Sequence, residues 1–298
     1  MSAGAVLTPP IIDGPPDPVL IVIRELIYRA AGIFHPDAKL ALLGERCARR
    51  MKDLNLASFH QYAEHLASAP TRQAEMVALL NEITIGETCF FRSQPQLDAF
   101  RQVVLGKIVE AKRKIPARPL RIWSAGCSTG EEPYTLSIIL QEESAEILRG
   151  WTFEILATDL NYGSLDHARA ATYGSYSTRY LTEYYKRKYF SLVDDQLQVQ
   201  PSVRSSVTFT RLNLSDIGSL ATMRDFDVIF CCNVLIYFDL VSKRRVVQQF
   251  YRSLLPHGYL FLGRAESLFG VNNDFHLVHL PGATAYVRGD RRQQEMQP

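Results

Sequence analysis

Apolar residues at helical spacing fill the chain from about residue 18 to residue 80. Leu20, Ile23 and Ile27, for example, recur three and four positions apart. No convincing strand pattern occurs in this part, so we predict a small helical bundle. Its four helices are expected at about 18–30, 40–54, 56–66 and 72–81.

After a further helix expected over about 96–114, short apolar segments alternate with helical ones, which is typical of a parallel α/β sheet. The last two strands flank Pro281 and Gly282 and are predicted to form an antiparallel hairpin. The strands are expected from Leu120, at 153–158, 207–209, 226–232, 259–262, 275–280 and 283–287, the helices at 132–148, from Tyr162 and at 241–255, and a turn at 256–258.

Residues 173–210 interrupt this alternation. The segment is rich in tyrosine, lysine and arginine, and 190–193 and 196–199 are predicted to form a short antiparallel pair. We therefore expect an inserted subdomain there, and not a regular crossover helix. Prolines interrupt residues 1–17, which are predicted to be a disordered lead, and 289–298 are predicted to be an exposed, disordered tail.

The segment 120–134, LRIWSAGCSTGEEPY, predicts a ligand pocket. It reads as a strand, a turn with Gly126 and Gly130, and a helix start, which is the arrangement of nucleotide-type sites. Glu131 and the acid that follows it make the helix start a poor cradle for phosphate and favour a ligand with positive charge and hydroxyl groups. Asp159, at the end of the next strand, suits ribose hydroxyls, and a cap for the following helix explains it equally well.

Composition narrows the function classes. Lys+Arg 33 against Asp+Glu 31 gives a net charge of +2, so no global basic field indicates a nucleic-acid partner. The five cysteines lack C-x-x-C spacing and the seven histidines are scattered, so we expect reduced thiols and no metal. No apolar run approaches the roughly 20 residues of a membrane span. These features predict a cytoplasmic protein without membrane insertion.

Two further groups of residues are candidates for binding. Lys39, Arg46, Arg49 and Arg50 form a strip along one flank of the second helix, which is either a solvated face or a dock for an acidic partner. In the segment 81–93, Thr88 and Arg92 flank Phe90 and Phe91, and they would share one side if this segment opens a helix. Paired aromatics usually indicate core packing, and the arginine beside them also permits a ligand clamp.

Four motifs in order resemble the chemotaxis receptor methyltransferase family (CheR): TCFFR at 88–92, WSAGCSTGEEPY at 123–134, ATDL at 157–160 and FCCNVLIYFD at 230–239. The resemblance covers about residues 18–288. It implies an α/β fold, with the Rossmann-like sheet of a class I S-adenosylmethionine-dependent methyltransferase, an N-terminal helical bundle and a small inserted β-subdomain. The implied domains are a receptor-docking domain at 18–80 and a methyltransferase domain at 81–288 with its insert at 173–210.

The resemblance implies a protein-glutamate O-methyltransferase of chemoreceptors, whose product is S-adenosylhomocysteine. A glutamate acceptor is already ionised at neutral pH, so the reaction needs alignment and no general base. Arg92 and Tyr237 are expected to orient the acceptor or the charged end of the cofactor, and for Tyr237 a packed strand-end aromatic is equally plausible. The implied cofactor residues are Gly86, Thr88, Arg92, Ala125, Gly126, Glu131, Asp159, Leu160, Asn213, Leu214, Asn233 and Val234.

Family resemblance also assigns Lys39, Arg46, Arg49 and Arg50 to docking on acidic receptor helices. The turn at 193–196 lacks the glycines of members that bind a C-terminal receptor pentapeptide, so a tether-independent enzyme is expected, and a monomer. Three alternatives stay open. An NAD-dependent oxidoreductase lacks its G-x-G-x-x-G turn here, a nucleic-acid methyltransferase lacks its Pro-Pro-aromatic element, and a non-catalytic S-adenosylmethionine-binding adaptor of a sensory array is excluded least well.

Overall fold

The structure is a computed structural model that describes residues 17–84, 86–113 and 119–289. The chain forms two compact units that divide between residues 85 and 86. The disordered lead and tail expected from the sequence lie almost wholly outside the described residues. Among the residues that are described, no helix has the length and apolar character needed to cross a membrane.

The first unit is helical, and its helices agree with the sequence pattern to within a few residues. α1 ends at Gly32, whose φ of +68° lets its N–H reach the Tyr28 carbonyl oxygen at 2.7 Å. The third helix begins later than expected because Ser58 caps it, accepting a hydrogen bond from the Gln61 N–H. The elements are α1 (Val19–Ala31), η1 (Asp37–Lys39), α2 (Leu40–Asp53), α3 (Phe59–Ala67) and α4 (Arg72–Ile83).

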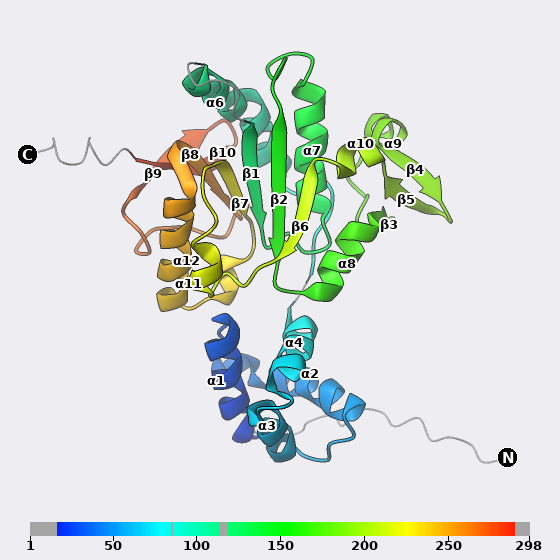
Figure 1. Ribbon diagram of the computed structural model, residues 1–298, viewed down its shortest axis with the longest axis vertical. Helices are drawn as coiled ribbons and strands as arrows, with labels where there is room; N and C mark the ends of the chain where they lie inside the picture. Colours follow the sequence, from blue (N-terminus) through cyan, green and yellow to red (C-terminus); the bar gives the residue numbers. More distant parts are fainter. Residues whose placement is uncertain (1–16, 85, 114–118, 290–298) are drawn as a thin grey trace, which may run out of the picture. The chain divides into compact units, whose positions relative to one another are not determined.

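A seven-stranded sheet forms the centre of the second unit, in the order β6-β2-β1-β7-β8-β10-β9 (Figure 1). The first five strands in this order pair in parallel, and β10 pairs antiparallel with β8 and β9, which confirms the predicted hairpin. The strands are β1 (Leu120–Ala125), β2 (Phe153–Asp159), β6 (Val207–Arg211), β7 (Phe226–Cys231), β8 (Leu254–Leu262), β9 (Phe275–Leu280) and β10 (Ala283–Arg288).

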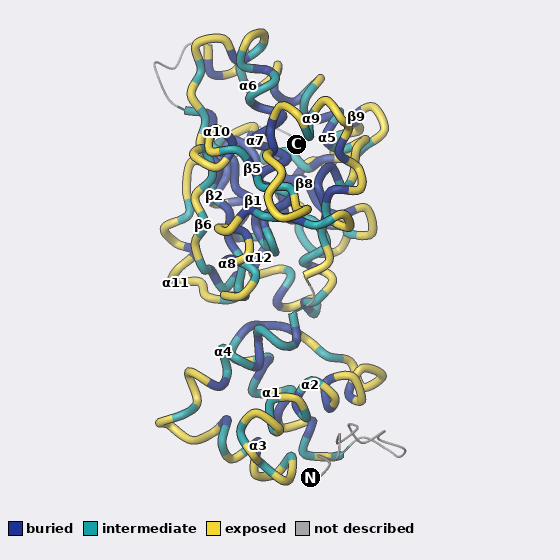
Figure 2. The backbone as a smooth tube through the Cα atoms, turned by 90° about the vertical axis from the view of Figure 1, so that its right-hand side faces the viewer, coloured by how far each residue is buried: buried dark blue, intermediate teal, exposed yellow. Residues whose placement is uncertain are grey.

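Helices cover both faces of this sheet, because successive residues of each strand point to opposite sides. Ile122 of β1 belongs to the cluster shared with α5 (Gln94–Ala99), η2 (Phe100–Val104), α6 (Leu105–Lys112) and α7 (Glu131–Glu143), whereas Trp123 packs with α11 (Ile217–Leu220) and α12 (Leu240–Ser253). α8 (Tyr162–Ala170) also packs on the sheet, through Leu165 against Ala157. The central strands are accordingly buried, while many of the connecting loops are exposed (Figure 2).

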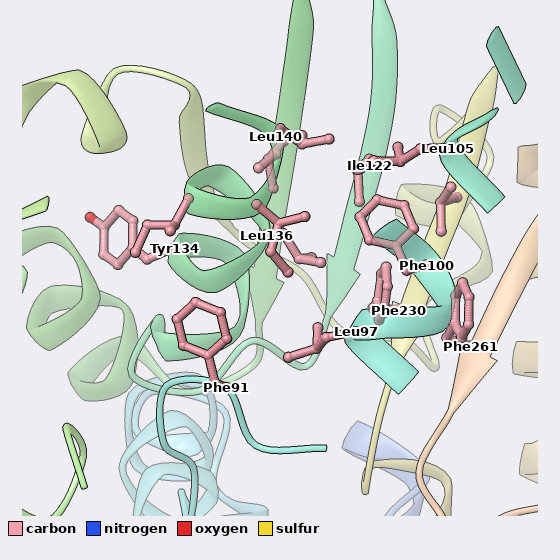
Figure 3. Close-up of a cluster of buried hydrophobic side chains, with 14 of the residues drawn as sticks. Phe91, Leu97, Phe100, Leu105, Ile122, Tyr134, Leu136, Leu140, Phe230 and Phe261 are labelled. Carbon is pink, nitrogen blue, oxygen red and sulfur yellow. The ribbon is translucent and has the colours of Figure 1, made fainter. Parts of the chain in front are cut away.

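The helix expected over 96–114 is interrupted by η2, a π-helical segment. This segment carries Phe100 onto the strands, where its ring meets Phe230 edge-on at 5.4 Å (Figure 3). Phe230 in turn stacks on Phe261 of β8 at 4.7 Å. The helix expected to reach residue 148 also differs, since α7 ends at Glu143.

A small sheet in the order β3-β5-β4 lies within the segment predicted to be an insert. Its hairpin turns at Asp194 and Asp195, both with positive φ, so aspartates take the left-handed positions without any glycine. The expected range 173–210 includes most of β6, which belongs to the large sheet. The elements are β3 (Thr172–Tyr173), α9 (Glu183–Tyr189), β4 (Phe190–Val193), β5 (Gln196–Val199) and α10 (Pro201–Arg204).

The turn expected at 256–258 lies inside a strand. Phe226 of β7 pairs with Leu254 and Val228 pairs with Tyr259, so the residues between them on β8 form a bulge. Gly258 is required there, because a Cβ atom would lie 2.9 Å from the Leu255 carbonyl oxygen.

Candidate functional site

The loop between β1 and α7 meets the loop after β7 at the carboxyl ends of adjacent strands. Gly126 has φ +80°, and a Cβ atom on it would lie 2.4 Å from Val234 Cγ2. The backbone N–H groups of Gly126 and Cys127 donate to the Thr158 carbonyl oxygen at 2.7 and 2.9 Å. Ala125, Gly126 and Val234 are thus brought together, as the sequence predicted, at the edge of an open α/β sheet where ligands bind.

Asp159 ends β2 and organises this same loop. Its Oδ2 accepts the Ser128 N–H at 2.8 Å and its Oδ1 accepts the Asn161 N–H at 2.9 Å. Burial raises the pKa of Asp159, while the N–H groups of Asn161, Ser128 and Leu160 act in the opposite direction. The cap of α8 is Asn161, whose Oδ1 accepts the Ser164 N–H. Asn161 therefore takes the helix-capping role that was the alternative for Asp159.

The two glutamates that open α7 face different surroundings. Glu131 is 1% exposed, and its Oε2 accepts the Thr129 hydroxyl at 2.6 Å. Glu132 Oε1 accepts the hydroxyl of Ser124, on β1, also at 2.6 Å. Burial raises the pKa of Glu132 to about 7, opposed by hydrogen bonds from Ser124 and Cys232 and by the charge of Arg92. The sequence predicted that both acids disfavour phosphate, and the family resemblance assigned a direct cofactor contact to Glu131 alone.

Glu266 holds the loop after β7, and sequence reasoning missed it. Its Oε2 accepts the N–H groups of Asn233 and Gly263, each at 2.7 Å, and its Oε1 accepts the Ile236 N–H at 3.2 Å. These bonds hold Asn233 at φ +62°. This backbone conformation is strained for residues other than glycine. No short motif contains Glu266, since it follows β8, so only the three-dimensional structure shows its partners.

The segment 86–93 is not a helix, so the condition under which Thr88 and Arg92 would share one helical side is not met. Phe91 has φ +54° and Ser93 has φ +106°, so the chain turns sharply before α5 begins at Gln94. Phe90 and Phe91 are both buried. Phe91 N–H donates to the hydroxyl of Thr135, on α7, at 3.1 Å. The aromatic pair fixes this segment in the core, and Arg92 follows it.

Arg92 and Tyr237 are close enough to interact electrostatically. Arg92 Nη1 donates to the Glu87 carbonyl oxygen at 2.7 Å. Burial raises the pKa of Tyr237, the charge of Arg92 lowers it, and the charges of Glu266 and Glu87 raise it. Tyr237 belongs to η3 (Leu235–Tyr237), directly after the loop held by Glu266. The two residues predicted to orient the reactants are therefore brought to one place.

Gly86 lies beside the loop between β1 and α7. A Cβ atom on Gly86 would lie 2.9 Å from Ser128 Oγ. That hydroxyl is buried and has no hydrogen-bond partner within the described part of the chain. A buried hydroxyl without a partner beside the Asp159 carboxylate fits a ligand that carries hydroxyl groups.

The remaining predicted residues continue the same edge. Leu212 N–H donates to the Asp159 carbonyl oxygen at 3.0 Å, so Asn213 and Leu214 follow directly beside the acid. Asn213 Oδ1 accepts the Ser215 N–H at 3.0 Å. Leu160 follows Asp159 in the chain, and Thr88 is two residues after Gly86. These groups fit an adenosyl ligand with a cationic end.

The basic strip of the first unit is not uniform. Arg46 and Arg49 both place Nη1 near Glu82 Oε1, at 3.5 and 2.7 Å, and Lys39 is exposed. Arg50 instead contacts the buried carboxylate of Glu75 through Nε at 3.0 Å and Nη2 at 2.9 Å. Tyr62, which is fully buried, donates its hydroxyl to the same carboxylate at 2.8 Å. Arg50 thus has a structural partner inside the bundle.

We expect Arg50→Ala to destabilise the first unit by about 3 kcal/mol, because it leaves the Glu75 carboxylate buried and uncompensated. Arg49→Ala is the matched control. Its side chain is 59% exposed, and loss of such a pair costs about 1 kcal/mol or less. Hydrogen exchange of peptides from α3 and α4, followed by mass spectrometry, measures both. Equal protection in the two variants would contradict the structural role of Arg50.

Taken together, the fold and these loops at the carboxyl ends of the strands are those of a class I methyltransferase that uses S-adenosylmethionine. The chain belongs to the CheR family of chemotaxis protein methyltransferases. Residues 86–284 match the family model described as the CheR methyltransferase SAM binding domain, and residues 20–84 match the CheR methyltransferase all-alpha domain.

Relatives in several bacteria agree with this membership. The chain is 36% identical over 266 residues to chemotaxis protein methyltransferase 2 of Vibrio cholerae, covering 89% of this chain and 91% of the relative. It is 32% identical to the chemotaxis protein methyltransferase of Borreliella burgdorferi, covering 84% and 88%. It is also 32% identical to chemotaxis protein methyltransferase 2 of Pseudomonas aeruginosa, covering 89% and 90%.

Proposed function

We propose that this protein transfers the methyl group of S-adenosylmethionine to glutamate side chains of chemoreceptors in the cytoplasm. The products are glutamate methyl esters and S-adenosylhomocysteine. Esterification changes the charge of the acceptor side chain from −1 to 0, which alters the electrostatics of a receptor helix and can shift a signalling equilibrium.

One observation carries the proposal. The loop at 126–130 joins two acids: Asp159 accepts the Ser128 N–H, and Glu131 accepts the hydroxyl of Thr129. A ribose suits the first acid and an ammonium group suits the second. Glu131 at the start of α7 would repel the phosphate groups of a dinucleotide, which bind at that helix end in dinucleotide-binding folds.

Different residues of the chain bind different parts of S-adenosylmethionine. Asp159 and Leu160 take the ribose end, with Asn213 and Leu214 beside the adenine. Glu131 accepts the amino group, Gly126 lets the backbone approach, and Asn233 lies at the reacting end. Gly86, Thr88, Ala125 and Val234 complete the walls. When bound, S-adenosylmethionine supplies an electrophilic methyl group on a positively charged sulfur.

Arg92 and Tyr237 orient the acceptor carboxylate. An acceptor glutamate has an ordinary pKa of about 4.3, so it enters as an anion and no residue has to remove a proton. The side chains must hold the carboxylate in line and exclude water, which strengthens the interaction between opposite charges. Arg92 supplies the positive charge for this task, and Tyr237 supplies a hydroxyl donor.

Docking of the receptor belongs to the first unit in this proposal. Lys39, Arg46 and Arg49 present positive charge along α2, and Arg50 fixes the helix that carries it. We further propose a monomer that works without a metal and without a receptor pentapeptide tether, since Asp194 and Asp195 form the β4–β5 turn without glycine. Measurable affinity for a receptor C-terminal pentapeptide would contradict the last point.

Two measurements test the proposed function. S-adenosylhomocysteine should raise the melting temperature of the protein, and NAD should not. The protein should also transfer labelled methyl groups to chemoreceptor-rich membranes, and mild base should release the label, as expected for an ester. Stabilisation by S-adenosylhomocysteine without any transfer would support a non-catalytic adaptor of a sensory array. Base-stable label would contradict an ester product.

A further inference from the structure

Two tyrosines and an arginine form an exposed stack in the loop between β3 and α9. The guanidinium of Arg179 lies 4.0 Å from the ring centroid of Tyr176 and 5.0 Å from that of Tyr180. The tyrosines are 59% and 60% exposed. We call these three residues the Tyr-Arg-Tyr platform. Stacking on the rings holds the guanidinium in place while its edge stays available to water.

The platform is attached to the segment that carries Arg92. Tyr176 donates its hydroxyl to Glu87 Oε1 at 3.0 Å. One residue later, the Ser177 carbonyl oxygen accepts the Phe90 N–H at 2.9 Å. The Thr178 hydroxyl closes the loop on the Gly174 carbonyl oxygen at 3.0 Å. These contacts attach the platform to the segment 86–93 at two successive residues of the loop.

Arg179 and Arg92 act on the same buried group. Burial raises the pKa of Cys89, and the charges of Arg179 and Arg92 both lower it. The charges of Glu131 and Glu87 act in the opposite direction. Both arginines therefore contribute positive charge to the surroundings of Cys89, Arg92 from a partly buried position and Arg179 from an exposed one.

The charge of Arg179 is not neutralised by an ion pair. Across the described ranges, no carboxylate forms a salt bridge with it, and its Nη1 donates to the Tyr176 carbonyl oxygen. By contrast, Lys186 and Lys188 nearby in the chain pair with Glu183 and Glu142. A stacked, preorganised guanidinium without an acidic partner suits a carboxylate brought by another molecule.

We propose that the Tyr-Arg-Tyr platform binds an acidic helical segment of the acceptor protein. Arg179 holds a carboxylate that neighbours the glutamate reaching Arg92 on the same segment. The rings of Tyr176 and Tyr180 cover the aliphatic stems of neighbouring side chains. This inference rests on the proposed function for the existence of a protein acceptor, and it adds a surface that selects among glutamates by their neighbours.

The test is Arg179→Gln, assayed by methyl transfer to chemoreceptor-rich membranes. We expect KM for the receptor to rise about 5- to 30-fold, because one charged contact at the rim of an interface is lost. The value of kcat should stay within about twofold, since Arg179 does not touch the reacting atoms. Affinity for S-adenosylhomocysteine should not change. The dependence of KM on salt should become shallower, because a screened attraction has been removed.

Arg149→Gln is the matched control. Arg149 is an exposed arginine beyond the far end of α7, and its side chain donates to the Ala145 carbonyl oxygen at 3.1 and 2.9 Å. It should leave KM and its salt dependence unchanged. Arg179→Lys should recover part of the loss, since it keeps the charge but not the planar stack.

Three results overturn the inference. The first is an Arg179→Gln variant with the KM of the control. The second is a fall in kcat and in S-adenosylhomocysteine affinity together, which would show that Arg179 only supports the loop. The third is an unchanged KM for Tyr176→Ala together with a normal melting temperature. Absence of methyl transfer by the unmodified protein would instead refute the proposed function.

Discussion

Asp159→Asn should lower the affinity of the protein for S-adenosylhomocysteine by about 100-fold or more. Asp159 Oδ2 accepts the Ser128 N–H and Oδ1 accepts the Asn161 N–H. An asparagine keeps the size but turns an NH₂ group toward one of these donors. It also loses the charge that strengthens hydrogen bonds from ribose hydroxyls, each worth about 1.5–3 kcal/mol. Two such bonds account for the expected factor, which isothermal titration calorimetry can measure.

Asp166→Asn is the control for this change. Asp166 is an exposed residue of α8 that pairs with Arg169 at 2.9 Å, and loss of that surface pair should alter binding by less than about threefold. If both variants bind S-adenosylhomocysteine like the unmodified protein, Asp159 does not hold the ribose. If Asp159→Asn loses affinity only in proportion to a lower melting temperature, its role is confined to organising the loop.

Above pH 7, Glu132→Gln should be more stable than the unmodified protein by about 3 kcal/mol. At low pH this gain should disappear. Burial raises the pKa of Glu132 from 4.5 to about 7, which corresponds to about 3 kcal/mol. Between these two values the unfolded chain loses its proton while the folded chain keeps it. The free energy of unfolding therefore falls as pH rises through this window, and the full penalty applies above pH 7. Glutamine is neutral throughout and removes the penalty.

The difference in free energy of unfolding between Glu132→Gln and the unmodified protein should thus grow from pH 4.5 to pH 8, measured by urea denaturation. Glu142→Gln, on the same helix, is the control with the opposite sign. Burial raises the pKa of Glu142, but hydrogen bonds from Lys188, Tyr189 and Tyr184 outweigh it and lower the value overall. That variant should lose stability at neutral pH and lose less as the pH falls. A flat difference for Glu132→Gln would contradict a buried, protonated acid.

Sequence patterns predicted the fold, and they indicated which segments meet at one edge of the sheet, because both depend on local features. Apolar strands, the glycines of the 126–130 loop and the acid at the end of β2 are all visible within short windows. The predicted residues Gly126 and Val234 meet although they follow different strands, since the carboxyl ends of parallel strands share one edge. The four family motifs then connected these short segments, because the motifs occur in a fixed order along the chain.

Features that depend on contacts between residues far apart in the chain could not be predicted from the sequence. The π-helical segment η2 packs Phe100 against Phe230 and Phe261, which are more than a hundred residues away in the sequence. The strip on α2 looked uniform, because helical projection cannot show that Arg50 meets Glu75 of α4. The conformation of the segment that carries Thr88 and Arg92 stayed open, because a positive φ at a residue such as Phe91 has no signature in the sequence.

The carboxylate of Glu266 has a mechanical consequence. It joins the loops that follow β7 and β8 through the N–H groups of Asn233, Ile236 and Gly263. Neither loop can shift alone without breaking a charge-assisted hydrogen bond, so the two loops are mechanically coupled. A displacement of Gly263 after β8 would pull on Asn233 after β7, and the reverse.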